Sequence, residues 1–284
     1  MSTATPKIVI KSPREIELMR AAGRLVCGIL DELEEHVRPG GTTAELNEMA
    51  SRRIRDAGAT ALFLGVRNPQ ARYPFPASIC SSVNEEVVHG VPNERPLKEG
   101  DIVKVDCGVR LRGYCGDSAR TFAVGRVSPT ARRLMEVTRA TLDLAIREIR
   151  PYARWSAIAR KMQRFVQEHG YGVVREFVGH GIGREMHEEP KVPNYVERDK
   201  NAVDFQLLPG MTLAIEPMVT AGRPEVEFRD RDRWTVVTKD RSLAAHYEHM
   251  IAVTETGVTI LTNGALAAPQ ELSHEGAEQR EAHL

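Results

Sequence analysis

The chain has 284 residues, of which 42% are hydrophobic, enough apolar material to bury the core of one large domain or two small ones. Its 39 lysines and arginines balance its 39 aspartates and glutamates, and a formal net charge of zero argues against a basic nucleic-acid arm or a basic membrane patch. No apolar run approaches the roughly 18 residues that would span a bilayer, and the first residues lack the apolar core of a signal peptide.

Two capped helices are predicted at the start of the chain. Residues Ser12–Glu15 combine a Ser cap, a Pro at the first helical position and a Glu three residues after the cap. Apolar residues then recur at helical spacing over 16–37. Residues Thr42–Glu45 form a second capping box, which opens a shorter helix. A strand-like run over 60–66 and a Pro-rich loop over 68–76 follow.

Two apolar, β-branched runs then predict a β-hairpin over roughly 101–124. If Leu111 and Arg112 form its turn, Asp106 lies directly opposite Asp117, and their Cβ atoms are about 5 Å apart on one face. Two ionised carboxylates at that distance repel each other by roughly 3 kcal/mol at an effective dielectric constant near 20. Such a pair needs a shared proton or a cation. The alternative is that one aspartate is only a surface residue beside the turn.

The helix pattern of the first half recurs in the second half at an offset of 112 residues. Residues 37–39 (Val-Arg-Pro) and Gly58 return as 149–151 (Ile-Arg-Pro) and Gly170. Apolar residues at helical spacing lie before and after both Arg-Pro breaks, which indicates a duplicated unit. We therefore expect an α/β (α+β) fold of two similar halves related by a pseudo-twofold axis. One sheet would run across both halves, and a site would lie at the joint.

The second half carries groups that could hold a metal together with the two aspartates. His180 lies among glycines, which allow close backbone approach and leave the imidazole free to reach a site. Glu216 ends the apolar run 211–215, and Glu248 lies near the start of the run 247–253. Four carboxylates and one imidazole suit divalent first-row cations better than a structural zinc site. Each residue taken singly has an ordinary structural explanation, so the prediction depends on the combination.

Three other residues have a structural and a functional interpretation. His89 lies between apolar residues and a Gly turn, which suits a core histidine as well as a functional one. His187, taken alone, is more typical of a turn. Trp234 lies in a charged stretch and is typical of a half-buried loop anchor.

Residues 263–284 show no periodicity and predict a disordered tail.

Five features, taken together, resemble type I methionine aminopeptidases of metallopeptidase family M24. They are the segments Val83–Pro92, Gly179–Pro190, Ile215–Met218 and Trp234–His249 and the spacing of Asp106 and Asp117. The resemblance extends from about Ile10 to Thr262. It implies the pita-bread fold, a pseudo-twofold sandwich with a central, mostly antiparallel sheet flanked by helices. The domain organisation would be a single catalytic domain over 1–262, with halves at about 13–124 and 125–262, followed by the tail.

The same resemblance implies a metal centre with two divalent ions per subunit, Mn, Fe, Co or Zn. The implied ligands are Asp106, Asp117, His180, Glu216 and Glu248. Asp117 and Glu248 would bridge the two ions, Asp106 would complete one site, and His180 with Glu216 would complete the other. A hydroxide activated by the metal pair would then attack the first peptide bond.

The resemblance also implies catalytic and substrate-binding roles. Glu216 would shuttle the proton, His89 would contact the scissile nitrogen, and His187 would bind the substrate and stabilise the tetrahedral oxyanion. The pocket for the methionine side chain would be lined by Phe75, Cys80, Met186 and Trp234, with the edge of His89.

The chain departs from the family pattern in the wall of that pocket. Segment 65–78 is longer than the family's short Gly-Tyr-His-Gly-aromatic-Pro-Lys-Ser stretch, and Ala77 stands where Lys is common. Met186 stands where Phe is frequent, and Cys-Gly follows Asp106 in place of Val-Thr. The implied ligand set is intact, so these departures concern the shape of the pocket.

The function implied by the resemblance is removal of the initiator methionine before a small second residue, a step of protein maturation in the cytoplasm. The substrate would be the N-terminal Met of nascent polypeptides, with the ribosome as a candidate partner. We expect a monomer, with neither DNA nor a membrane as a partner.

Two alternatives stay open at this point. The first is an Xaa-Pro aminopeptidase or prolidase of the same fold, which normally carries a large extra N-terminal domain. The second is a non-catalytic binding protein of this fold, which typically loses metal ligands.

The four cysteines, Cys27, Cys80, Cys107 and Cys115, show no Cys-x-x-Cys spacing, so we expect free thiols of a cytosolic protein.

Overall fold

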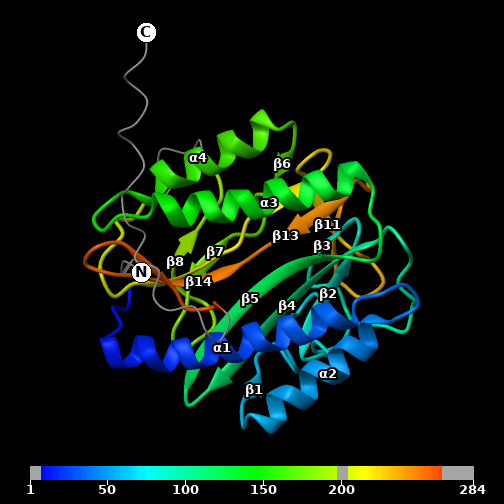
Figure 1. Cartoon of the computed structure of the whole chain (residues 1–284), viewed down its shortest axis with the longest axis horizontal. Helices are drawn as coiled ribbons and strands as arrows, with labels where there is room; N and C mark the ends of the chain where they lie inside the picture. The colour runs from blue at the N-terminus through cyan, green and yellow to red at the C-terminus, as the bar shows by residue number, and fades with distance from the viewer. Residues whose placement is uncertain (1–7, 197–203, 264–284) are drawn as a thin grey trace, which may run out of the picture.

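The structure, a computed structural model, describes residues 8–196 and 204–263 (Figure 1). Most of the expected tail, 263–284, therefore lies outside the described residues. The described helices are α1 (Pro13–His36), α2 (Thr43–Asp56), α3 (Pro129–Glu148) and α4 (Trp155–Glu168). The strands are β1 (Thr60–Ala61), β2 (Ile79–Val83), β3 (Glu86–Val88), β4 (Ile102–Leu111), β5 (Tyr114–Ala123), β6 (Gly172–Val173), β7 (Gly179–Gly181), β8 (Glu188–Val192), β9 (Thr212–Ile215), β10 (Met218–Thr220), β11 (Val226–Phe228), β12 (Val236–Thr238), β13 (Ala244–His246), β14 (His249–Val253) and β15 (Val258–Ile260).

The predicted helix starts and the internal repeat are both confirmed. Ser12 and Thr42 cap α1 and α2 in complete capping boxes, in which the cap side chain and the Glu three residues later each accept a backbone N–H. Both ends of α2 match those of α4 at the offset of 112 residues, and the last residues of α1 and α3 match at the same offset. Among the described residues, no helix is both long enough and apolar enough to cross a membrane.

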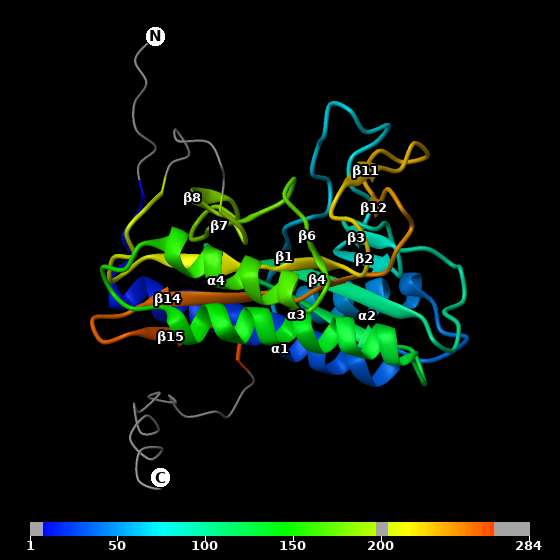
Figure 2. The same ribbon diagram turned by 90° about the horizontal axis from the view of Figure 1, so that it is seen from above.

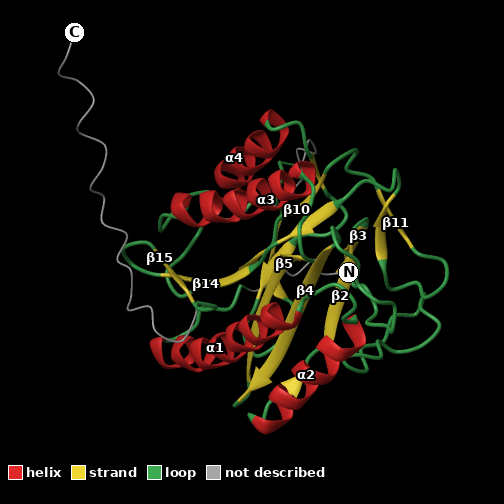
Figure 3. Ribbon diagram, turned by 45° about the vertical axis from the view of Figure 1, so that its right-hand side comes forward, coloured by secondary structure: helices red, strands yellow, loops and turns green. Residues whose placement is uncertain are grey.

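The two helix pairs pack on different strands, as expected for a fold of two similar halves. Side chains of α1 and α2 share an apolar core with β2 and β4, where Ile79, Val103 and Val105 are buried. Side chains of α3 and α4 share a second core with β9 and β14. Figure 2 shows α1 and α3 on one side of the central strands, and Figure 3 shows the two helix pairs flanking them. The mixed α/β fold class is confirmed, while the division into halves at 13–124 and 125–262 stays a prediction.

The expected single sheet is divided into four hydrogen-bonded sheets in the described part of the chain. Their strand orders are β1-β4-β2 with β5 on β4, β13-β10-β6, β11-β12-β3, and β15-β14-β9-β7-β8, and the ladders are antiparallel. Side chains of β5 interrupt the ladder where the halves meet, because Thr121 Oγ1 donates to His246 O (2.7 Å) and Ser118 Oγ donates to Glu248 O (2.6 Å). One backbone bond, from Glu248 N to Ala119 O (2.8 Å), joins the halves there.

The β4–β5 hairpin is confirmed, but its predicted register is wrong. The turn residues are Arg112 and Gly113, with φ angles of 52° and 82°, because a two-residue hairpin turn of this type requires positive φ at both positions. Asp117 consequently lies opposite Gly108, and Asp106 lies opposite Ala119. The two aspartates are diagonal neighbours rather than direct partners, and the period of two residues keeps both on one face.

The strand-like run over 60–66 is mostly not a strand. Only Thr60 and Ala61 pair with β4. A tight turn follows, in which Val66 N donates to Phe63 O (3.1 Å), and it directs the Phe63 ring into a buried aromatic cluster. Tertiary packing of this one ring has overridden the β-propensity of its neighbours.

Candidate active site

One cavity brings together every residue that the sequence singled out for a site. It is lined by Asp106, Asp117, His180, Glu216 and Glu248, by His89 and His187, and by Phe75, Cys80, Met186 and Trp234. These residues come from both halves of the chain, and the cavity lies at their joint, as predicted. Their shared position is a structural finding, whereas the individual roles are proposals taken up below.

The hairpin supplies two carboxylates to the floor of this cavity. Asp117 is almost fully buried, with 1% of its surface exposed. One carboxylate oxygen of each aspartate, Oδ1 of Asp106 and Oδ1 of Asp117, is buried without a hydrogen-bond partner among the described residues. Buried polar atoms are seldom left unpaired, so these oxygens indicate a missing donor or cation.

His180 reaches the aspartates because its neighbours are glycines. A Cβ atom on Gly179 would lie 2.3 Å from Ala214 O, and one on Gly181 would lie 2.3 Å from Glu189 O. Side chains at these positions would therefore push β7 away from β9 and β8. His180 Nδ1 lies 2.9 Å from Gly181 O, a backbone hydrogen bond that leaves Nε2 free to face the cavity.

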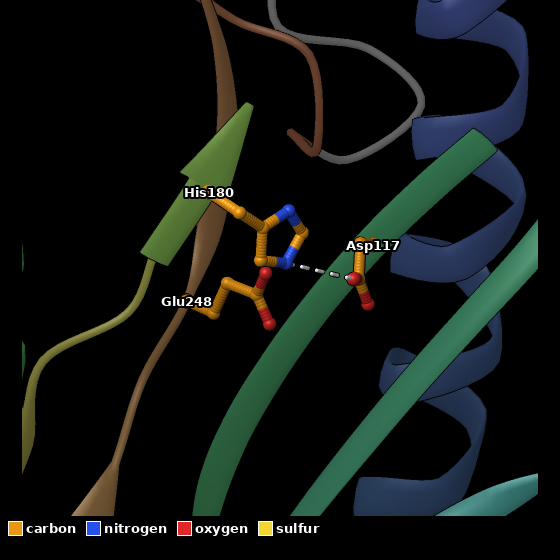
Figure 4. Close-up of side chains that lie close together, drawn as sticks. All are labelled: Asp117, His180 and Glu248. Carbon is orange, nitrogen blue, oxygen red and sulfur yellow. Dashed lines mark ion pairs between the residues drawn. The ribbon is translucent and has the colours of Figure 1, made fainter. Parts of the chain in front are cut away.

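Glu216 and Glu248 complete the polar end of the cavity. His180 Nε2 lies 3.6 Å from Glu216 Oε1 and 3.9 Å from Asp117 Oδ2. One ligand atom each from Asp117, His180 and Glu248 lie within 4.8 Å of one another. Figure 4 shows these three side chains converging from β5, from β7 and from the segment before β14. Glu248 Oε1 is a third buried oxygen without a partner among the described residues.

Burial perturbs every ionisable group in this cluster. It raises the pKa of Asp106 to about 7. Burial, followed by the charges of neighbouring carboxylates, also raises the pKa values of Asp117, Glu216 and Glu248 well above the usual range. For His180, burial and then the nearby His187 lower the pKa to about 4, so the ring is neutral at pH 7. A neutral imidazole among crowded carboxylates has the chemistry of a binding site for divalent cations.

The other end of the cavity is apolar. Phe75 packs edge-on against Trp234, with ring centroids 5.3 Å apart, and Cys80 belongs to the same buried cluster. Two lining residues, Phe63 and Val66, were missed by the sequence analysis. The only sequence signal for them was the apolar run over 60–66, which was interpreted as a strand.

Loop 65–75 is held against this apolar end. Gly65 N donates to Phe75 O (2.8 Å), and Phe75 N donates to Val66 O (2.8 Å), which closes the base of the loop. Trp234 Nε1 donates to Tyr73 O (2.9 Å) and ties the loop to the opposite wall. Trp234 is therefore an anchor and a pocket residue at once, so the two interpretations of this residue are compatible.

The two remaining histidines lie between the polar and the apolar ends. His89 has a φ angle of 57°, an unusual backbone conformation for a residue other than glycine and one that is enriched at functional sites. Burial lowers the pKa of His89 to about 4, and its ring packs edge-on against Phe177. His187 is exposed at the mouth, and its ring centroid lies 4.4 Å from that of His180. Partial burial also lowers the pKa of His187.

Comparison with known proteins agrees with this geometry. The family model described as metallopeptidase family M24 matches residues 17–255. The chain is 47% identical over 255 residues to methionine aminopeptidase 1 of Bacillus subtilis, covering 90% of this chain and 99% of that protein. The crystal structure of methionine aminopeptidase from Rickettsia prowazekii superposes with a TM-score of 0.85 at 39% identity, over 90% of this chain and 100% of that one.

A likeness in fold alone extends further. The Xaa-Pro dipeptidase from Bacillus anthracis superposes with a TM-score of 0.69 at 24% identity, and this chain covers 61% of it. The family match spans nearly all of the described chain and includes every element that lines the cavity. With a relative 47% identical along almost its whole length, the chain belongs to metallopeptidase family M24.

Proposed function

We propose that the chain is a metal-dependent methionyl aminopeptidase that removes the initiator methionine from proteins. The observation that carries this proposal is the construction of the cavity, in which a cluster of buried carboxylates and one imidazole opens directly onto an apolar pocket. Such a cavity can hold an uncharged side chain at one end and the adjoining peptide bond at the other. Methionine aminopeptidases that are 44–47% identical over 90% of the chain support the same function.

The residues present fit a centre of two divalent ions. Asp106, Asp117, His180, Glu216 and Glu248 would hold the ions, and the three unpartnered carboxylate oxygens among them would gain the partners that they lack. When bound, the ions would polarise the scissile carbonyl and lower the pKa of a water molecule. Hard oxygen donors with a single nitrogen suit Mn, Fe, Co or Zn, and the choice depends on geometry and metal availability.

The protein groups around this centre would orient the substrate and move protons. Glu216 would accept and return the proton that is transferred to the leaving amine. His89, held in its strained backbone conformation, would face the nitrogen of the scissile bond. His187 at the mouth would donate an N–H to the developing oxyanion of the substrate carbonyl.

The apolar end would hold the methionine side chain. Phe75, Trp234, Met186 and Cys80 offer soft or aromatic surface, and sulfur–aromatic contacts contribute roughly 0.3–1.5 kcal/mol each. A small second residue is proposed from the relatives rather than from this geometry. Action on nascent polypeptides in the cytoplasm, contact with the ribosome and a monomeric state complete the proposal.

An Xaa-Pro aminopeptidase or prolidase activity is not favoured. The Xaa-Pro dipeptidase shares the fold with this chain at only 24% identity, whereas the methionine aminopeptidase relatives match along nearly their full length. A non-catalytic role is not favoured either, since the implied ligand positions keep metal-binding side chains that face one cavity.

Peptides that differ only at the first residue test the proposed function. We expect kcat/KM for a Met-Ala-Ser peptide to exceed that for a Lys-Ala-Ser peptide by on the order of 100-fold or more. The reason is that burying an unpaired charge in the apolar pocket would cost several kcal/mol. An Ala-Pro-Ser peptide serves as the second comparison. Faster cleavage of Ala-Pro-Ser than of Met-Ala-Ser would overturn the assignment in favour of the Xaa-Pro enzymes.

Replacing His187 tests its role in stabilising the transition state. His187→Ala should lower kcat by about 100-fold with a smaller change in KM, because an oxyanion donor acts mainly in the transition state. Steady-state kinetics on Met-Ala-Ser measure both constants. Glu185→Ala is the matched control, since Glu185 lies two residues away and pairs with Arg110 on the surface. A change confined to KM would show that His187 only binds the substrate.

A further inference from the structure

Glu216 lies between two imidazoles rather than beside one. Its Oε1 atom is 3.6 Å from His180 Nε2, and its Oε2 atom is 3.8 Å from His246 Nε2. His180 lines the cavity, whereas His246 lies behind Glu216 with only 1% of its surface exposed. No role for His246 is expected from the sequence alone.

The backbone around both residues is fixed, so their separation is built into the fold. His246 is the last residue of β13 and pairs with Met218 of β10, two residues after Glu216. Its backbone N–H donates to Thr121 Oγ1 (3.0 Å), and Thr121 Oγ1 donates to its carbonyl (2.7 Å). The backbone carbonyl of Glu216 accepts from Asn194 Nδ2 (3.1 Å). Only side-chain rotation remains to set the distance between the imidazole and the carboxylate.

The imidazole of His246 has a buried nitrogen that lacks a partner. Its Nε2 atom has no hydrogen-bond partner among the described residues, and leaving such a group unpaired costs about 1–3 kcal/mol. A separation of 3.8 Å is too long for a hydrogen bond. A small rotation of either side chain would bring Nε2 and Oε2 into direct contact.

The imidazole of His246 can donate one N–H to a facing acceptor. A neutral imidazole carries a single proton, on either Nδ1 or Nε2. With the carboxylate of Glu216 facing Nε2, the proton belongs on Nε2.

We propose that His246 is a positioning residue for Glu216, in which the Nε2–H donates to Oε2 and thereby presents Oε1 to His180 and the metal site. The inference rests on the proposed function, in which Glu216 is both a ligand and a proton shuttle. A carboxylate held at one oxygen cannot rotate away from the site. Groups that orient metal ligands in this way typically contribute 10–100-fold to metal affinity or activity.

Two substitutions at position 246 separate positioning from packing. His246→Leu keeps a similar volume but removes the donor, and it should weaken Mn²⁺ binding to the metal-free protein by about 10–100-fold. It should also lower kcat for Met-Ala-Ser more than it changes KM. His246→Gln places an amide N–H close to the position of Nε2. It should restore the Mn²⁺ affinity and kcat to within about threefold of the wild-type values, a smaller change than the 10–100-fold loss expected for His246→Leu.

A matched control removes a partly buried imidazole that does not line the cavity. His169 lies at the C-terminus of α4, where its Nδ1 contacts Phe165 O (2.7 Å). His169→Leu should lower thermal stability without changing Mn²⁺ affinity. Calorimetric titration with Mn²⁺ measures affinity in all three variants without relying on catalysis.

The tautomer of His246 gives a direct test in the wild-type protein. Nitrogen-15 NMR of labelled histidine, assigned with His246→Gln, should show the proton on Nε2. A proton on Nδ1, or wild-type Mn²⁺ affinity in His246→Leu, would overturn the proposal. If the wild type bound Mn²⁺ but failed to cleave Met-Ala-Ser, the proposed function would fail while this inference would still be tested.

Discussion

Replacing Asp117 by Asn should lower kcat for a Met-Ala-Ser peptide by more than about 1,000-fold, because a catalytic metal contributes several kcal/mol of transition-state stabilisation. Asp117 belongs to the group whose ligand atoms lie within 4.8 Å of one another, and its Oδ1 atom has no protein partner among the described residues. Asn keeps the shape of the side chain but removes the charge, and its amide can turn an N–H toward the site. The variant should therefore lose metal together with activity.

Metal analysis of the purified protein, combined with steady-state kinetics, measures this effect. The matched control is Asp101→Asn, since Asp101 is also buried but accepts hydrogen bonds from Lys98 N (2.9 Å) and Asn84 Nδ2 (2.8 Å). That control should lose stability and keep its metal. Chelation should abolish the activity of the wild type, and full activity of Asp117→Asn in chelator would refute the metal-dependent mechanism.

Local sequence signals predicted the features of the fold that depend on local chemistry. Capping at Ser12 and Thr42 and the Arg-Pro breaks set helix ends that the structure confirms, because caps and breaks act within one helical turn. The glycines beside His180 were interpreted as sites of close backbone approach, and short distances to Ala214 O and Glu189 O explain that requirement. The ligand positions themselves came from the resemblance to a known family.

The hairpin register and the pocket wall were harder to predict, for different reasons. The predicted hairpin register was wrong because Leu111 and Arg112 were assumed to be the turn residues between the two apolar runs. The turn forms one residue later, at Arg112 and Gly113, which adopt the positive φ angles that this type of turn requires. Phe63 and Val66 were missed because a short, continuous apolar run resembles a strand. Their position depends on a turn and on contacts with Phe75, which lies far along the loop. His246 was missed because only the pairing of β10 with β13 brings it to Glu216.

The raised pKa of Asp106 determines how the stability of the metal-free protein should depend on pH. Burial raises the pKa of Asp106 to about 7 from an ordinary value of 3.8. Between these pH values the folded protein keeps a proton that the unfolded chain has released. The free energy of unfolding therefore falls as pH rises through this window and levels off above about pH 7. The ionised carboxylate costs the metal-free fold a few kcal/mol at neutral pH.

Asp106→Asn should remove that cost, so the variant should be more stable than the wild type when both are metal-free. We expect the difference in the free energy of unfolding to reach a few kcal/mol at pH 8 and to be less than half as large at pH 5. Urea unfolding in chelator at the two pH values measures it. The buried histidines, including His89 and His180, also titrate differently on folding, but they are present in both proteins and largely cancel in the difference.

Adding a divalent metal should oppose this effect. An ion that binds the folded wild type stabilises it by mass action, by about 2.7 kcal/mol at a concentration 100 times the Kd. The variant lacks one ligand and should gain less. In Mn²⁺ at 100 times the Kd and pH 8 the advantage of the variant should therefore be smaller than in chelator, by up to about 2.7 kcal/mol. A variant that is destabilised to the same extent in chelator and in Mn²⁺ would show that Asp106 is a structural residue with no part in holding metal.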